Sequence, residues 1–290
     1  MAENHPGPLQ GMQVLTLAVN VPGPAAAARL RGLGASAVKV EPPAGDPLER
    51  FCPSWYAALC AGQKVLRLDL KSREGREELR RHLAVSDLLL TSSRPAALER
   101  LGLGPEDLLR EHPRLCQVAI VGYPPPREEE PGHDLTYLAG TGLLSPPEPP
   151  RTLLADLAGA ERAASAALAL LLRRERGRGA GREVVSLAQA ASGMAEPLRH
   201  GLTAPGGLLG GGFPGYGLYR AADGWVAVAA LEEHFWRGLL AGLGLPEGAG
   251  REEISARLAQ RGCREWEQWA LERDLPLAAV KEAPPRGEEE

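Results

Sequence analysis

Short apolar stretches alternate with helical patterns through the first half of this chain, and that alternation restricts its fold more than any other feature. The stretch at 115–121 is apolar except for Gln117, as a strand covered on both faces of a sheet requires. Ser72 is a suitable N-cap for a helix at 73–83. Strands that alternate with helices favour a parallel sheet, so we expect an α/β fold with a Rossmann-like large domain at residues 1–200. The predicted strands are 12–17, 37–40, 65–68, 87–90, 115–121 and 183–187.

The second half of the chain changes in composition where glycines accumulate. This Gly-rich segment, 201–217, predicts a linker, because such sequences form loops more readily than helices or strands. A smaller α+β domain is expected at 218–283, with a hairpin turn at 221–224. Residues 284–290 are polar and acidic, and we expect a frayed tail there. Helices of the small domain are expected to begin near Glu232, Glu252 and Cys263.

Charge and composition exclude several classes of function. The formal net charge is −4, and no basic stretch is interleaved with aromatic residues, so nothing suggests a nucleic-acid partner. No apolar run is long enough to span a membrane, and the N-terminus lacks a signal-peptide pattern. The four cysteines form no metal-binding spacing, so we expect no metal site. A cytoplasmic protein fits these observations.

Three ionisable residues stand in distinct local settings: His133 after a Pro-rich loop, Asp156 at the start of a long helix, and Glu232 at the start of another. A histidine and a carboxylate on opposite sides of one carbon can remove and return a proton. A second carboxylate beside the histidine would fix its tautomer. Structural alternatives remain for each: a loop histidine, a helix N-cap, and an acid that favours a helix dipole.

An ordered set of short motifs makes the chain resemble the class III CoA-transferase family, also called CaiB/BaiF, and within it the racemases of α-methylacyl-CoA. The resemblance implies a Rossmann-like CoA-binding domain, a linker, a small domain and usually a homodimer. It implies no cofactor beyond the CoA moiety of an acyl-CoA substrate. The motifs are 9–14, 22–24, 33–35, 38–41, 68–71, 94–95, 98–102, 132–137, 155–156 and 175–179.

The resemblance also implies roles for the three ionisable residues. Asp156 matches the position that serves as nucleophile in the transferases and as acid or base in the racemases. The transferases lack the histidine that His133 matches, whereas the racemases combine it with a tyrosine at the position of Tyr137. Glu232 matches the glutamate that pairs with this histidine. The motifs therefore favour racemisation of 2-methyl-branched acyl-CoA over CoA transfer through an Asp156 anhydride.

Contacts with the CoA moiety are expected from Arg94, Lys39, Lys64 and Tyr137. Arg94 follows a predicted strand, and loops at the carboxyl ends of parallel strands bind ligands. The chain departs from the family at Pro42, where members usually carry an arginine that helps to hold CoA phosphates. That loss leaves a third hypothesis, a CoA-binding homologue without catalytic activity.

Overall fold

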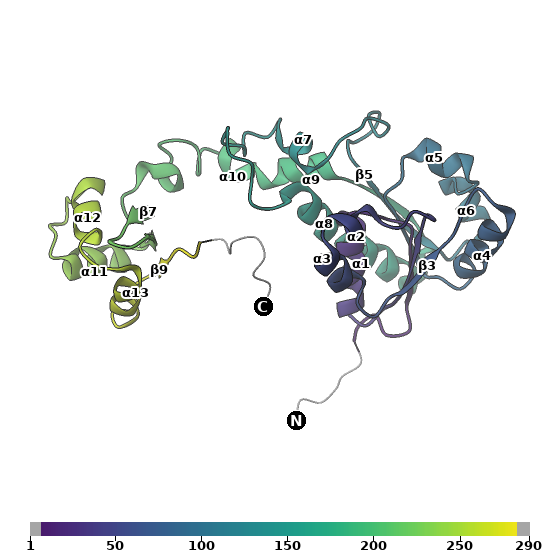
Figure 1. Ribbon diagram of the computed structural model, residues 1–290, viewed down its shortest axis with the longest axis horizontal. Coiled ribbons are helices and arrows are strands. Elements are labelled where there is room, and N and C mark those ends of the chain that lie inside the picture. Colours follow the sequence, from purple (N-terminus) through teal and green to yellow (C-terminus); the bar gives the residue numbers. More distant parts are fainter. Residues whose placement is uncertain (1–6, 283–290) are drawn as a thin grey trace, which may run out of the picture. The chain divides into compact units, whose positions relative to one another are not determined.

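The computed structural model describes residues 7–282, which form two compact units divided between Ala195 and Glu196 (Figure 1). Each unit has its own hydrophobic core. The domain boundary predicted at residue 200 and the linker predicted at 201–217 stay predictions, and the tail predicted for 284–290 lies outside the described residues.

The first unit is built on a six-stranded sheet in which every strand pair is parallel. The strand order is β3-β2-β1-β4-β5-β6, so the chain returns to the middle of the sheet between β3 and β4. The carboxyl ends of β1 and β4 therefore diverge into loops on opposite sides of a crevice, where such sheets bind ligands. The predicted Rossmann-like α/β fold is confirmed. The strands are β1 (Gln13–Thr16), β2 (Ser36–Glu41), β3 (Lys64–Arg67), β4 (Leu88–Thr91), β5 (Cys116–Val121) and β6 (Arg182–Ser186).

The helices on one face of this sheet pack through small residues. These helices are α1 (Pro22–Gly32), α8 (Leu154–Arg173) and α9 (Leu187–Met194). Ala27 of α1 and Ala163 of α8 are completely buried in the same cluster. Side chains as short as alanine let neighbouring helices approach closely, which explains the Ala-rich sequence of both segments. The long helix predicted from the sequence is α8.

Leucines pack the helices on the opposite face, which are α4 (Arg73–Leu83), α5 (Pro95–Arg100) and α6 (Pro105–Glu111) (Figure 1). The predicted N-cap of α4 is confirmed, because the Ser72 hydroxyl accepts a hydrogen bond from the Gly75 amide at 3.0 Å. Such a cap satisfies an N–H group that has no partner within the helix.

Short helices after β2 and β5 were not predicted. α2 (Pro47–Phe51) and α3 (Pro53–Cys60) follow β2, and α7 (Asp134–Leu138) follows the Pro-rich loop after β5. α2 and α3 each begin with a proline, which suits the first helical turn because its missing N–H would have no partner there. The carboxylate of Asp46 caps α2 by accepting from the Leu48 amide.

The second unit contains a three-stranded antiparallel sheet, β7-β8-β9. The predicted hairpin is confirmed, and the Ala221 amide donates to the Gly224 carbonyl at 3.0 Å. β9 was not predicted, since it is only 3 residues long and pairs with β8 from a distant part of the chain. The elements are α10 (Glu196–Arg199), the wide turn η2 (Leu208–Gly212), β7 (Tyr216–Arg220), β8 (Trp225–Ala229), α11 (Glu233–Leu243), α12 (Arg251–Leu258), α13 (Cys263–Leu271) and β9 (Leu277–Ala279).

Throughout the described range 7–282, no helix combines the length and the apolar character needed to cross a membrane.

Candidate active site

Two of the three predicted catalytic residues line one small cavity in the first unit. His133 and Asp156 both face a space of about 140 Å³ near the carboxyl ends of β4 and β5. The walls also include Tyr137 and the backbone of Gly122 and Gly132. The structure therefore brings together a histidine and a carboxylate that are far apart in the sequence.

His133 is the N-cap residue of α7, and its backbone is fixed by Thr136. The His133 amide donates to Thr136 Oγ1 at 2.9 Å, and the Thr136 hydroxyl donates to the His133 carbonyl at 2.7 Å. Because the threonine closes this turn, the imidazole is not needed to cap the helix. The ring is exposed and borders the cavity, where it can exchange a proton with a bound molecule.

Asp156 lies in the first turn of α8, where the long helix begins. Its amide donates to Oδ1 of Asp134 at 3.0 Å, and Asp134 is buried at 5% exposure. Burial, and secondarily the charge of Asp134, raise the pKa of Asp156 to about 7. A carboxyl group with this pKa is present in both protonation states near neutral pH, as an acid–base catalyst requires.

Tyr137 of α7 lines the same cavity. Its side chain is buried at 7% exposure, and the ring meets Tyr123 edge-on with centroids 5.2 Å apart. Burial, and then the charge of Asp156, raise the pKa of Tyr137 to about 12, against an opposing effect of Arg94. The hydroxyl therefore stays protonated at neutral pH and can donate a hydrogen bond.

Gly122 leaves the space that the Tyr137 hydroxyl occupies, since a Cβ atom there would lie 2.5 Å from the hydroxyl oxygen. We expect Gly122→Ala to lower the free energy of unfolding by about 1–3 kcal/mol, because the ring must shift to admit the methyl group. Urea denaturation measures this loss. Gly140→Ala is the matched control, because a Cβ at Gly140 meets nothing within 4 Å. An equal loss of stability in both variants would show that the contact with Tyr137 is not the cause.

Arg94 borders an adjoining cavity of about 130 Å³ that shares Gly122, Gly132 and Tyr137 with the first. It is the N-cap residue of α5, directly after β4. The loop that follows β5 folds over this region, where Glu129 accepts a hydrogen bond from the Ala96 amide at 2.8 Å. Arg94 thus lies beside the predicted catalytic residues, in a position from which it can reach a bound anion.

A third cavity, of about 550 Å³, lies at the carboxyl ends of β1, β2 and β3. Leucines and prolines, including Pro42, form half of its wall, and Lys71 is the one cation among the described residues that line it. The sequence contained the motif at 68–71 but gave no sign that it borders a cavity. Val19 lines both this space and the cavity of Asp156.

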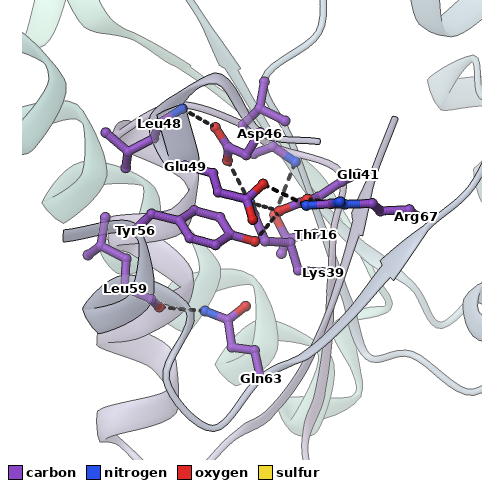
Figure 2. Close-up of polar contacts among 12 residues, drawn as sticks. Thr16, Lys39, Glu41, Asp46, Leu48, Glu49, Tyr56, Leu59, Gln63 and Arg67 are labelled. Carbon is purple, nitrogen blue, oxygen red and sulfur yellow. Dashed lines mark hydrogen bonds and ion pairs between the residues drawn. The ribbon is translucent and has the colours of Figure 1, made fainter. Parts of the chain in front are cut away.

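The two predicted lysine contacts need correction. Lys39 is fully buried, with Nζ 2.6 Å from Glu41 and 2.5 Å from Asp46, so its ammonium has no exposed surface for a phosphate (Figure 2). Lys64 is exposed but begins β3, at the edge of the parallel sheet opposite the loops that carry the cavities. Neither side chain joins the other candidate residues.

Glu232, the third predicted catalytic residue, belongs to the second unit. It is the exposed N-cap residue of α11, and its carbonyl accepts from the Trp236 amide at 2.9 Å. The neighbouring Glu233 forms an ion pair with Arg237. Glu233 is therefore engaged within its own helix, and the pairing of Glu232 with His133 remains a prediction.

A Rossmann-like sheet with a histidine and an aspartate at its carboxyl edge agrees with the family resemblance. Comparison with known proteins identifies the class of protein. Residues 9–284 match the model of CoA-transferase family III, so the chain belongs to this family. The resemblance stated from the sequence motifs is confirmed.

Relatives within the family carry both activities in their names. An alpha-methylacyl-CoA racemase of Mus musculus is 36% identical over 87% of this chain and 68% of its own length. The subunit BbsE of succinyl-CoA:(R)-benzylsuccinate CoA-transferase from Thauera aromatica is 32% identical over 72% of this chain and 57% of its own length. The chain thus spans about two thirds or less of these relatives. A solved structure, the hypothetical protein Rv3272 from Mycobacterium tuberculosis, superposes with a TM-score of 0.83 at 27% identity over 96% of this chain and 86% of that one.

Proposed function

We propose that the protein racemises the α-carbon of 2-methyl-branched acyl-CoA thioesters by 1,1-proton transfer. The observation that supports this most is the shared cavity of His133 and Asp156, in which the carboxyl group has a pKa of about 7. A histidine and a carboxyl group that face one small space suit the removal and return of one proton.

In the proposed reaction one of the two residues removes the α-proton, and the electron pair of the broken C–H bond moves onto the thioester oxygen. The other residue then donates its proton to the opposite face of the carbon. The enolate oxygen needs a hydrogen-bond donor, and the protonated hydroxyl of Tyr137, a residue that lines the cavity, is proposed for that role. The Asp156 amide is not that donor here, because Asp134 accepts its hydrogen bond.

The CoA moiety is proposed to occupy the large apolar cavity beside the site. Its volume of about 550 Å³ suits a nucleotide-sized group, and Val19 separates it from the cavity of Asp156. Arg94 is proposed to contact a phosphate or the pantetheine chain from the adjoining cavity. Glu232 is proposed to pair with His133 in the assembled enzyme, which the family resemblance implies is a homodimer.

Solvent exchange tests this function. Incubation of a single 2-methylacyl-CoA stereoisomer with the protein in D₂O is expected to produce both stereoisomers with deuterium at the α-carbon. His133→Ala is expected to slow inversion by about 10²–10⁴-fold, the usual contribution of general acid–base catalysis. Mass spectrometry and chiral analysis of the recovered acid measure both results. A wild-type protein that left the α-hydrogen unexchanged would refute the proposal.

CoA transfer is the second candidate, supported by the CoA-transferase activity named for a relative. In that reaction the Asp156 carboxylate attacks the thioester carbonyl, the C–S bond breaks, and CoA leaves as the thiolate. The resulting mixed anhydride would react with hydroxylamine and leave a hydroxamate on Asp156. Peptide mass spectrometry after turnover with hydroxylamine distinguishes this candidate, which also predicts no deuterium in the acyl group.

A further inference from the structure

The segment Val19–Asn20, after β1, forms the wall between the two cavities that the proposed reaction uses. Val19 lines both cavities, and Asn20 lines the one that contains Asp156 and His133. Asn20 has a positive φ of 66°, which non-glycine residues rarely adopt. Because this backbone conformation is unfavourable for asparagine, the segment needs contacts that stabilise it. Those contacts come from residues outside the segment.

Two side chains hold the wall through its backbone amides. The Asn20 amide donates to Oδ1 of Asp46 at 2.9 Å, and the Val19 amide donates to the Ser92 hydroxyl at 3.2 Å. Asp46 is buried at 1% exposure, and the same Oδ1 also accepts from the Leu48 amide at 3.0 Å. One carboxylate oxygen therefore joins the wall of the cavity to the start of α2.

The second oxygen of Asp46 is fixed by a buried cation. Lys39 Nζ donates to Asp46 Oδ2 at 2.5 Å and to Glu41 Oε1 at 2.6 Å, and all three side chains are almost completely buried. Figure 2 shows Lys39 in one cluster with Glu41, Asp46 and Tyr56, and the Tyr56 hydroxyl donates to Glu41 from α3. Charge-assisted bonds on both oxygens leave the carboxylate of Asp46 a single orientation.

We propose that Asp46 is a positioning residue, which holds the Val19–Asn20 wall through the Asn20 amide and thereby keeps water away from Asp156. It touches no substrate in this role and acts only through the backbone of the wall. Asp46 would hold this wall whichever reaction the site performs.

The titration of Asp156 reports on this wall, because burial is the main cause of its raised pKa. Loss of the wall would admit water and lower the pKa of Asp156 toward the ordinary range of a carboxyl group. His133 and Tyr137 line the cavity with Asp156, and Asp134 accepts a hydrogen bond from its amide; none of these groups is replaced by a substitution at position 46. NMR of protein labelled with ¹³C-aspartate measures the titration without substrate, and Asp156→Asn assigns the signal.

Three variants separate the role of the hydrogen bond from those of charge and stability. Asp46→Ala removes the acceptor, and the pKa of Asp156 is expected to fall by about one unit or more. Asp46→Asn loses the same charge but keeps an oxygen for the Asn20 and Leu48 amides, so the pKa is expected to stay near that of the wild type. Ser72→Ala removes a comparable helix cap on α4, and it is expected to lower the melting temperature without moving the pKa.

If all variants fold, either of two results would overturn the proposal. One is an unchanged titration of Asp156 in Asp46→Ala, which would show that the wall does not need this contact. The other is an equal downward shift in Asp46→Asn, which would assign the effect to charge alone. If the wild type shows α-hydrogen exchange, Asp46→Ala is expected to lower kcat more than it raises KM, because the catalytic groups and not the large cavity are disturbed.

Discussion

Lys39→Met is expected to lower the free energy of unfolding of the first unit by about 3–5 kcal/mol, among the largest effects of any single substitution in this chain. Methionine is similar in length to lysine, so it fills the space without the charge. The carboxylates of Glu41 and Asp46 then stay buried without their shared cation, and uncompensated buried charge is costly. Urea denaturation, followed by circular dichroism at pH 7, measures the loss.

Lys64→Met is the matched control for this substitution. Lys64 is an exposed lysine at the start of β3, and we expect its replacement to change the stability by about 0.5 kcal/mol or less. The pair of variants also tests the sequence-based expectation that both lysines contact CoA. A stable Lys39→Met protein with a raised KM for acyl-CoA would contradict the structural role and restore the ligand role.

The sheet could be predicted from the sequence because its strands have local signatures. β5 is apolar except for Gln117, since helices cover both faces of the sheet around it. The start of α4 was equally clear, because Ser72 offers a side-chain acceptor directly before a helical pattern. Each of these signals lies within a few residues of the structure that it specifies.

The buried ion pairs could not be predicted in this way, because Asp46 lies outside the strand β2 that carries Lys39 and Glu41. Lys39 in β2 appeared to be a cation available for a ligand, and no local pattern joins it to Asp46 beyond the end of the strand. Asp46 caps α2 and Tyr56 lies in α3, and these short helices, each of which begins with a proline, bring both residues back to β2. Lys39 is buried because the segment after β2 folds back onto the strand, and the neighbours of Lys39 in the sequence do not show this.

The sequence motifs predicted which residues form the candidate site, but not the contacts and the pKa shift that the structure shows there. The family motifs indicated His133 and Asp156, and the cavity contains both. The contact between Asp134 and the Asp156 amide was missed, although Asp134 follows His133 in the same motif. Sequence motifs identify which residues are present, whereas the raised pKa of Asp156 depends on burial by distant strands and loops.

Asp156→Asn is expected to abolish most activity and to stabilise the fold at pH 8, which separates the catalytic from the structural role of this residue. The amide cannot exchange a proton, so we expect a loss of about 10²–10⁴-fold in α-hydrogen exchange. Burial raises the pKa of Asp156 from 3.8 to about 7, so ionisation above pH 7 destabilises the folded state. Removing the charge is expected to add on the order of 2 kcal/mol at pH 8, after allowance for partial exposure.

The size of this gain in stability depends on pH. Below pH 4 the carboxyl group is protonated in both the folded and the unfolded chain, so the variant and the wild type are expected to be equally stable. Between pH 4 and 7 the carboxyl group of Asp156 is ionised in the unfolded chain but protonated in the folded one. The wild type therefore loses stability as the pH rises through this window. Urea denaturation at both ends measures the difference, with the exposed Asp107→Asn as a control. A constant difference across the range, or a destabilised variant at pH 8, would show that Asp156 is not a buried acid of raised pKa.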